Sequence, residues 1–121
     1  MKFLVTGGAG FIGSNYMHYV VNKYPEDYFV CLDALTYAGN YNNIKDLENM
    51  KNFEFVKGDI TDREFIDKLF NDKKFDIVIN FAAESHVDNS IKNPGIFLNT
   101  NIIGTQVLMD ASRKYNIKRY H

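Results

Sequence analysis

The feature that most constrains this chain is a glycine-rich turn close to its N-terminus, at residues 5–14. An apolar run ends there and the sequence continues as a helical pattern, which predicts a strand that leads directly into a helix. Glycine has no Cβ, so it tolerates positive φ and lets backbone N–H groups touch the phosphates of a ligand. The glycines fit a dinucleotide-binding loop in two overlapping spacings, Gly8-x-Gly10-x-x-Gly13 and Gly7-x-x-Gly10-x-x-Gly13.

An acidic residue stands where such a loop needs one. Asp33 lies twenty positions beyond Gly13, at the end of the next apolar run. Its carboxylate can accept two hydrogen bonds from the ribose diol of an adenosine, and its charge repels a 2′-phosphate. The sequence therefore favours NAD over NADP. The alternative interpretation of Asp33 is a carboxylate at the mouth of a loop that is merely solvated.

Strand-like and helix-like segments alternate four times along the chain. This alternation is typical of an α/β fold with a doubly wound parallel sheet of the Rossmann type. Right-handed crossovers predict the strand order 3-2-1-4, and the start of a fifth strand at residues 118–121 makes the fold incomplete. The expected strands are residues 2–6, 28–32, 53–57 and 77–79, and the expected helices are residues 12–23, a segment beginning near 61, and residues 94–115.

The helices carry further expectations. The string Thr61-Asp62-Arg63-Glu64 is a capping box, which predicts that the Thr61 hydroxyl caps the second helix. At the start of the first helix, Phe11 and Ile12 should supply backbone to a pyrophosphate and place their side chains in the core. Gly104 in the third helix costs about 1 kcal/mol relative to alanine, which close packing against the sheet would offset.

Composition limits the kind of partner. The 121 residues carry a net charge of −1 with both signs interspersed, so neither nucleic acid nor an anionic membrane is expected as a partner. A small-molecule ligand is expected instead. The only cysteine, Cys31, lies in an apolar run and predicts a buried structural thiol in a reducing compartment. No apolar stretch approaches a membrane span and no signal peptide is recognisable, so a soluble cytoplasmic protein is expected. His18, His86 and His121 lack metal-ligand spacing, and no metal site is predicted.

In a doubly wound sheet the ligand lies across the carboxyl ends of the strands. Four polar or glycine-rich segments fall at that edge, namely the glycine loop, residues 33–36, residues 59–60 and residues 81–88. Several strings in these segments are distinctive, above all Leu-Thr-Tyr-Ala-Gly-Asn at residues 35–40 and Ala-Glu-Ser-His-Val-Asp at residues 83–88.

On those strings the chain resembles the N-terminal part of the extended short-chain dehydrogenase/reductases, and among them the dTDP-glucose 4,6-dehydratase family. The resemblance covers essentially all 121 residues. One departure is Ala34, where many members carry lysine at the adenosine end of the cofactor. The resemblance implies NAD as cofactor and a conversion of dTDP-glucose to dTDP-4-keto-6-deoxyglucose by internal hydride transfer and loss of water.

The resemblance also implies roles for particular residues. Ser85 and His86 would lie beside the hexose and its diphosphate, with His86 an orienting or structural histidine rather than a base. For Asp59 the alternative is a turn-former, and for Thr100 a hydroxyl bonded to its own helix. The implied cofactor-binding residues are Gly7, Gly10, Phe11, Ile12, Gly13, Asp33, Ala34, Leu35, Thr36, Asp59, Ile60, Phe81, Ala82, Ala83 and Thr100.

The catalytic signatures of the family, a Tyr-x-x-x-Lys string and an Asp-Glu pair, are not expected within these residues. The two spacing matches, Tyr19-x-x-x-Lys23 and Tyr41-x-x-x-Lys45, fall in the wrong parts of the fold and are interpreted as chance. Residues 1–121 are therefore expected to form an NAD-binding Rossmann segment that lacks the catalytic and substrate-binding portion and is inactive alone. The alternatives are a fragment of a nucleotide-sugar 4-epimerase and a stand-alone nucleotide-binding module.

The family implies a homodimer for the full-length enzyme, through helices that include the one after the fourth strand. Apolar residues on that helix are then expected to remain partly uncovered, with self-association as the consequence. They are Phe97, Ile102, Ile103 and Val107.

Overall fold

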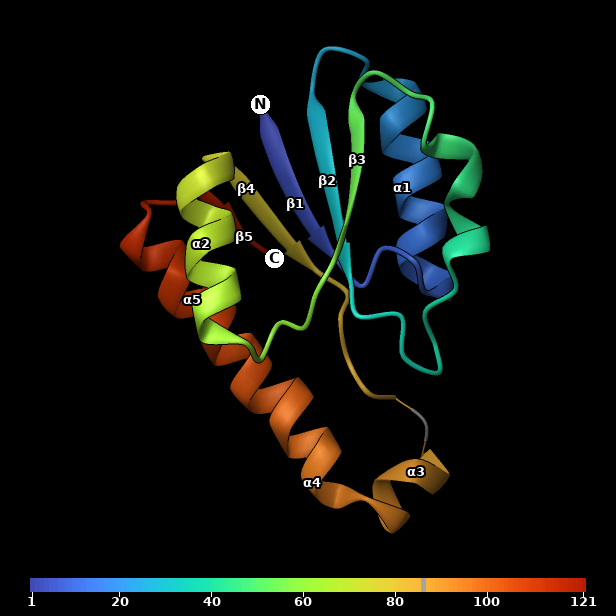
Figure 1. Ribbon diagram of the computed structural model, residues 1–121, viewed down its shortest axis with the longest axis vertical. Coiled ribbons are helices and arrows are strands. Elements are labelled where there is room, and N and C mark those ends of the chain that lie inside the picture. The colour runs from blue at the N-terminus through green and yellow to red at the C-terminus, as the bar shows by residue number, and fades with distance from the viewer. Residues whose placement is uncertain (86) are drawn as a thin grey trace.

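Five parallel strands form one open sheet in the order β3-β2-β1-β4-β5 (Figure 1). This computed structural model describes residues 1–85 and 87–121, with the backbone alone at residues 87 and 89. The predicted order 3-2-1-4 and the short fifth strand are confirmed. The strands are β1 (Lys2–Thr6), β2 (Tyr28–Asp33), β3 (Phe53–Lys57), β4 (Ile77–Asn80) and β5 (Arg119–Tyr120).

Helices cover both faces of the sheet. Neighbouring residues of a strand point to opposite faces, so Leu4 and Val5 of β1 enter different cores. Val5 packs in a cluster with α1 (Phe11–Lys23) and with the short turns η1 (Tyr41–Asn43) and η2 (Lys45–Leu47). Leu4 packs in the opposite cluster, formed with α2 (Arg63–Lys73) and α5 (Thr105–Lys114), and Figure 1 shows these helices on the other side of the strands.

The first turn of α1 lies outside the core. Phe11 is 84% exposed and Ile12 is 68% exposed, so the prediction that their side chains are buried is wrong. The buried face of the helix starts only at Gly13 and continues through Met17 and Val21. The reason is position: the helix begins at the carboxyl edge of the sheet, where residues 11 and 12 line a pocket instead of facing strands.

The cap of α2 differs from the predicted one. Asp62, not Thr61, is the N-cap residue, and its Oδ1 accepts a hydrogen bond from the Phe65 N–H at 3.1 Å. Thr61 is engaged elsewhere, because both its N–H and its hydroxyl donate to Asp59 Oδ1, at 2.9 and 2.8 Å. The capping box therefore marked the helix start correctly to within one residue and named the wrong side chain.

The predicted helix over residues 94–115 consists of three helical segments. Its glycine packs closely as expected, but against Ile60 after β3 rather than against the sheet: a Cβ on Gly104 would lie 2.5 Å from Ile60 Cδ1. A further helix, α3, precedes it and was not predicted. The additional helix α3 spans Val87–Lys92, and the three segments are α4 (Pro94–Phe97), the π-helical η3 (Leu98–Gly104) and α5, which ends at the C-cap Tyr115.

The outer surface of this helical region is apolar in part. Ile102 is 58% exposed and Ile103 is 40% exposed, in agreement with the expectation, and Phe97 is partly buried. Val107 is only 2% exposed, because it packs in the cluster that includes Ile66 of α2, so its predicted exposure is wrong.

The single cysteine is a core residue. Cys31 is fully buried, as predicted, and burial together with the nearby Asp33 charge raises the pKa of its thiol to about 12. A thiol with so high a pKa is unreactive near neutral pH. Within the described part of the chain, no helix has the length and apolar character that crossing a bilayer requires.

Candidate functional site

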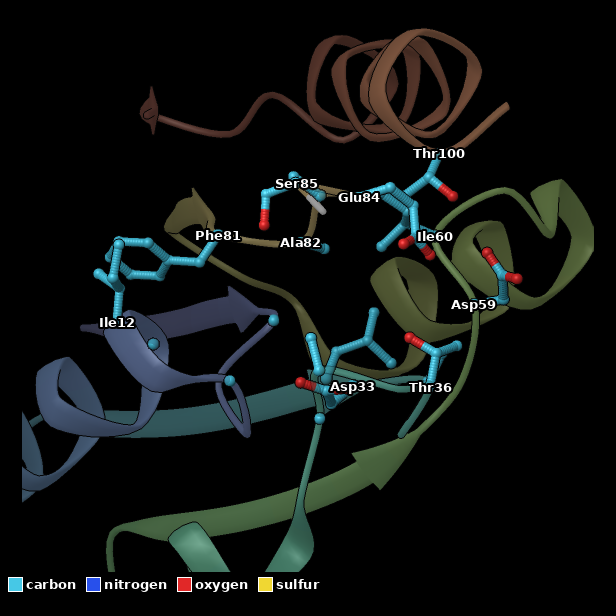
Figure 2. A pocket seen from close by; sticks show the side chains of 18 of the residues that line it. Ile12, Asp33, Thr36, Asp59, Ile60, Phe81, Ala82, Glu84, Ser85 and Thr100 are labelled. Atoms are coloured by element: carbon cyan, nitrogen blue, oxygen red, sulfur yellow. The ribbon is translucent and has the colours of Figure 1, made fainter. Parts of the chain in front are cut away.

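A pocket of about 550 Å³ opens at the carboxyl edge of the sheet (Figure 2). It lies where β1 separates β2 and β3 from β4, the place at which a doubly wound sheet binds ligands. Most of the predicted site residues line it. These are Gly7, Gly10, Phe11, Ile12, Gly13, Asp33, Ala34, Thr36, Asp59, Ile60, Phe81, Ala82, Ala83, Ser85 and Thr100.

The glycines of the loop serve different purposes. Gly7 has φ +69°, and a Cβ there would lie 2.5 Å from the Ala82 nitrogen, so the protein's own packing requires glycine. A Cβ on Gly13 would collide with the Gly7 carbonyl oxygen, which lets the helix pack tightly on the turn. Gly10 is different, because its nearest neighbour would be the Gly7 oxygen at 3.4 Å, an ordinary contact distance. The missing side chain of Gly10 therefore serves the pocket, not the packing.

The start of α1 leaves hydrogen-bond donors without acceptors. Gly10 is the N-cap and has no side chain to cap the helix, and the first turn contains no acidic residue. The first helical bond runs from the Ser14 N–H to the Gly10 oxygen at 2.9 Å. Among the described residues, the N–H groups of Phe11, Ile12 and Gly13 therefore have no acceptor, and all three residues line the pocket. Free N–H groups and the positive end of the helix dipole together favour an anion.

Asp33 joins two walls of the pocket. Its side chain is almost fully buried, and its Oδ2 accepts from the Ala9 N–H at 2.9 Å while its Oδ1 accepts from the Leu35 N–H at 2.8 Å. A carboxylate has about four acceptor sites, so both oxygens can still accept from a ligand. Asp33 therefore fixes the glycine loop to the segment after β2, a positioning role that the sequence did not predict.

Leu35 is the one described residue of the predicted site that does not line the pocket. It has φ +56°, a left-handed conformation, and its N–H is bound by Asp33. Its side chain packs against the cluster that contains Val5. The structure thus places Leu35 behind the pocket wall.

The end of β3 supplies one apolar and one acidic group. Ile60 is buried and Asp59 is exposed, and both line the pocket (Figure 2). Because Asp59 Oδ1 accepts two hydrogen bonds from Thr61, the turn-forming interpretation of Asp59 holds. It does not exclude binding, since the second carboxylate oxygen has no protein donor among the described residues.

The end of β4 is held by an amide side chain. Asn80 Oδ1 accepts from the Thr6 hydroxyl at 2.5 Å and from the Ala82 N–H at 3.1 Å. Asn80 Nδ2 donates to the Tyr120 hydroxyl at 3.3 Å, which links β4 to β5. Burial of Tyr120 raises the pKa of its phenol. Asn80 therefore sets the backbone of Ala82 against the pocket without lining it.

A second amide holds the next residues of the same loop. Asn101 Oδ1 accepts from the Glu84 N–H at 2.8 Å, and its Nδ2 donates to the Glu84 oxygen at 2.9 Å. Asn101 belongs to the π-helical η3, a conformation that is frequent at functional sites. Thr100, the residue before Asn101, lines the pocket. In this turn the hydroxyl that bonds to the backbone of its own helix is that of Thr105, which donates to the Asn101 carbonyl oxygen.

Comparison with known proteins assigns the chain. The protein family described as GDP-mannose 4,6 dehydratase matches residues 4–121. The chain belongs to this family.

The relatives that resemble this chain include dehydratases and an epimerase. The dTDP-glucose 4,6-dehydratase of Mycobacterium tuberculosis (strain ATCC 25618 / H37Rv) is 47% identical over 121 residues, which are 100% of this chain and 35% of that protein. A dTDP-glucose 4,6-dehydratase from Streptomyces venezuelae, solved with NAD bound, superposes with a TM-score of 0.90 at 40% identity over 99% of this chain and 38% of its own. The UDP-glucose 4-epimerase of Thermotoga maritima, solved with UDP-glucose, gives 0.88 at 32% identity, with 99% and 36% covered. The chain thus spans about a third of the length of the relatives it matches.

Some pocket residues were missed by the sequence analysis, and one predicted residue, His86, lies outside the described residues. The length and polarity of residues 34–43 were a signal that could have identified two of the missed residues. Gly58 adjoins a predicted residue and carried no separate signal, whereas Glu84 belongs to the distinctive string at residues 83–88 and was not singled out within it. The missed residues are Leu32, Ala38, Gly39, Gly58 and Glu84.

The two Tyr-x-x-x-Lys matches lie away from the pocket. Tyr19 accepts a hydrogen bond from Lys23 on the exposed side of α1, and Tyr41 donates to Glu48 at 2.6 Å. None of these residues lines the pocket. In the described part of the chain, no group of three or more His, Cys, Asp or Glu side chains is arranged to hold a metal ion.

Proposed function

We propose that this chain is the NAD-binding portion of a nucleotide-sugar dehydratase that converts dTDP-glucose to dTDP-4-keto-6-deoxyglucose. The observation that carries the proposal is a single pocket that combines three free N–H groups at the start of α1 with the carboxylate of Asp33. That pairing suits a ligand with an anionic centre and a diol beside it.

The pocket residues fit the parts of NAD. The N–H groups of Phe11, Ile12 and Gly13 would hold the pyrophosphate, which the missing side chain of Gly10 allows to approach. The remaining acceptor sites of Asp33 would hold the adenosine ribose, and a 2′-phosphate would meet its negative charge, so NAD is favoured over NADP. Asp59 and Ile60 would hold the adenine, and Phe81, Ala82, Ala83 and Thr100 would face the other half of the cofactor.

When bound, NAD supplies a hydride acceptor for oxidation of the sugar and a donor for its later reduction. The residues of this chain bind and orient the cofactor, and Ser85 with His86 would contact the hexose diphosphate. By resemblance, the acids and bases of the reaction belong to a catalytic Tyr-x-x-x-Lys string and an Asp-Glu pair that are not expected within these 121 residues, where the two Tyr-x-x-x-Lys matches are interpreted as chance. The chain alone is therefore expected to be inactive on dTDP-glucose.

The choice of substrate rests on the relatives. Proteins called dTDP-glucose 4,6-dehydratase are 40% to 50% identical to this chain, whereas the 4-epimerases among the solved structures are 29% to 32% identical. The string Glu-Ser-His-Val-Asp at residues 84–88 also favours the dehydratase, because it is not expected in an epimerase. The epimerase reading remains the second candidate on the strength of its matching fold.

Cofactor binding is the first test. A dinucleotide present at a hundred times its dissociation constant stabilises the folded state by about 2.7 kcal/mol, which raises the melting temperature by about 10 °C in a domain of this size. We expect such a shift with NAD and a much smaller one with NADP at equal concentration. Absence of both a thermal shift and calorimetric binding heat with NAD would contradict the proposal.

A further inference from the structure

The turn that follows β2 forms part of the pocket wall next to Asp33. It is closed by a hydrogen bond from the Gly39 N–H to the Thr36 oxygen at 3.1 Å. Thr36, Ala38 and Gly39 all line the pocket. The next residue, Asn40, donates its N–H to the Ala9 oxygen of the glycine loop at 3.1 Å. The turn is therefore attached to β2 at one end and to the glycine loop at the other.

Gly39 lies directly against the carboxylate of Asp33. A Cβ on Gly39 would lie 2.5 Å from Asp33 Oδ1 and 3.1 Å from Leu35 Cα. The local backbone conformation does not require glycine at position 39, because Gly7 is the only glycine with positive φ among the described residues. The close approach to Asp33 is therefore the reason that glycine is needed in this turn.

The two oxygens of Asp33 differ in their surroundings. Oδ2 accepts from the Ala9 N–H in a buried hydrogen bond, whereas Oδ1 accepts from the Leu35 N–H in a bond that is only partly buried. Asp33 as a whole is 9% exposed, so a ligand has only a small area through which to reach its carboxylate. Gly39 lies at Oδ1, the more open oxygen, and its missing side chain leaves this area free.

A methyl group on Gly39 would remove this access in either of two ways. If Asp33 stayed in place, the methyl group would occupy the space beside Oδ1 that a ligand hydroxyl needs, since such a hydrogen bond requires the two oxygens to approach to about 2.7 Å. If the carboxylate rotated away, the hydroxyl would lose its acceptor. In both cases a sugar hydroxyl loses its partner, whereas the base and the phosphates of a nucleotide, which meet other residues, keep theirs.

We propose that Gly39 determines the sugar specificity of this pocket, because its missing side chain keeps Asp33 Oδ1 open to the 2′-hydroxyl of a ribonucleotide. The inference rests on the proposed function, since it assumes that a nucleotide binds with its ribose at Asp33. A hydrogen bond to a charged group changes an affinity by at least about ten-fold. The pocket should therefore prefer ADP to 2′-deoxy-ADP by about that factor, and a side chain at position 39 should abolish the preference.

The test is calorimetric titration of the 121-residue chain with ADP and with 2′-deoxy-ADP, two probes that differ only in the 2′-hydroxyl. The variant is Gly39→Ala. The matched control is Gly95→Ala, because a Cβ on Gly95 meets nothing within 4 Å and Gly95 does not line the pocket. We expect Gly39→Ala to weaken ADP binding about ten-fold and 2′-deoxy-ADP binding less than about two-fold, and Gly95→Ala to change neither affinity.

A second glycine variant separates sugar recognition from a general loss of binding. Gly10→Ala obstructs the pyrophosphate, which both probes carry, so it should weaken both to the same extent and preserve their ratio. If Gly39→Ala also weakens both probes equally, Gly39 has a structural role only and the inference is overturned, while the proposed function stands. An unchanged affinity for ADP in Gly39→Ala has the same consequence.

The unaltered chain supplies a measurement that does not depend on any variant. In NMR spectra of the complex with ADP, the Hα protons of Gly39 should show nuclear Overhauser effects to the ribose protons, because the two groups would be in direct contact. Should Gly39→Ala fail to fold, as its melting curve would report, this measurement decides, and absence of the effect overturns the inference.

The unaltered chain also separates this inference from the proposed function. Equal affinities for ADP and 2′-deoxy-ADP, or binding of NAD without measurable binding of ADP, overturn the sugar specificity and leave cofactor binding intact. If the chain binds neither ADP nor NAD, both the inference and the proposed function are wrong.

Discussion

The two walls of the pocket are built in different ways. The wall formed by the glycine loop and β2 is shaped by residues of the wall itself. Gly7 makes a turn in which only glycine fits, and the Asp33 carboxylate accepts hydrogen bonds from two backbone N–H groups. The opposite wall, residues 81–85, is positioned from outside by the amides of Asn80 and Asn101. The first wall therefore depends on residues that line the pocket themselves, and the second on two amide side chains that do not line it.

The strongest way to test this contrast is at the glycines. Gly7→Ala places a Cβ at positive φ against the backbone of Ala82, so we expect the free energy of unfolding to fall by about 3 kcal/mol. Gly10→Ala meets only ordinary contacts and should cost less than about 1 kcal/mol, yet lower NAD affinity at least ten-fold. Urea denaturation and calorimetry measure the two quantities. Equal loss of stability in both variants would show that the loop is not divided in this way.

The next largest effect is expected at Asp33. Asp33→Ala removes the acceptor for the N–H groups of Ala9 and Leu35 and leaves both donors short of a partner, which should cost about 2 to 3 kcal/mol in stability. Cofactor affinity should fall as well, because the ribose acceptor is lost. Denaturant unfolding with and without NAD separates the effects. A variant that loses affinity at full stability would show that Asp33 does not hold this wall together.

Asn101 tests the other wall. Asn101→Ala frees the backbone of Glu84, and since this region is only partly buried we expect a loss of about 1 to 2 kcal/mol and a several-fold weaker affinity for NAD. Asn101→Asp is the comparison variant, because it keeps the acceptor for the Glu84 N–H while the donor to the Glu84 carbonyl becomes a charged oxygen. The stability and NAD affinity of Asn101→Asp should fall between those of the unaltered chain and those of Asn101→Ala. If Asn101→Ala binds NAD as tightly as the unaltered chain, the amide does not position this wall.

The smallest effect is expected at the edge of the sheet opposite the pocket. Asp76 accepts from the Lys2 N–H at 2.8 Å and pairs with Lys118 at 2.9 Å, and these contacts lower the pKa of its carboxyl. Because the folded-state pKa lies below the unfolded one, the contribution is present above the unfolded pKa and disappears as pH falls through the folded pKa. Asp76→Asn should cost about 1 kcal/mol at pH 7 and nothing at strongly acidic pH. A cost that persists in acid would point to packing instead of charge.

How far the sequence predicted the molecule follows the same division. The order of the strands, the burial of Cys31 and the pocket positions of Gly10 and Asp33 follow from local patterns, because hydrophobic period and glycine spacing act over a few residues. The role of Asn101 could not be predicted, because an asparagine in a sequence does not say which distant backbone group it will bind, and Glu84 lies 17 residues away. Asn80 bonds the backbone only two residues on, a local pattern that the sequence analysis missed. The exposure of Phe11 was mispredicted because an apolar residue at a helix start can face either a core or a pocket.

The π-helical η3 has a consequence for the two ends of the helix it interrupts. An α-helix rotates by about 100° with each residue, so the wider turn of η3 shifts the angular phase of everything on its N-terminal side relative to α5. Deleting a single residue here, such as the exposed Ile102, would restore ordinary winding without disturbing the core face of α5, and would turn Thr100 away from the pocket. The wider turn of η3 thus lets one helical run pack α5 against the core under the sheet while Thr100 lines the pocket.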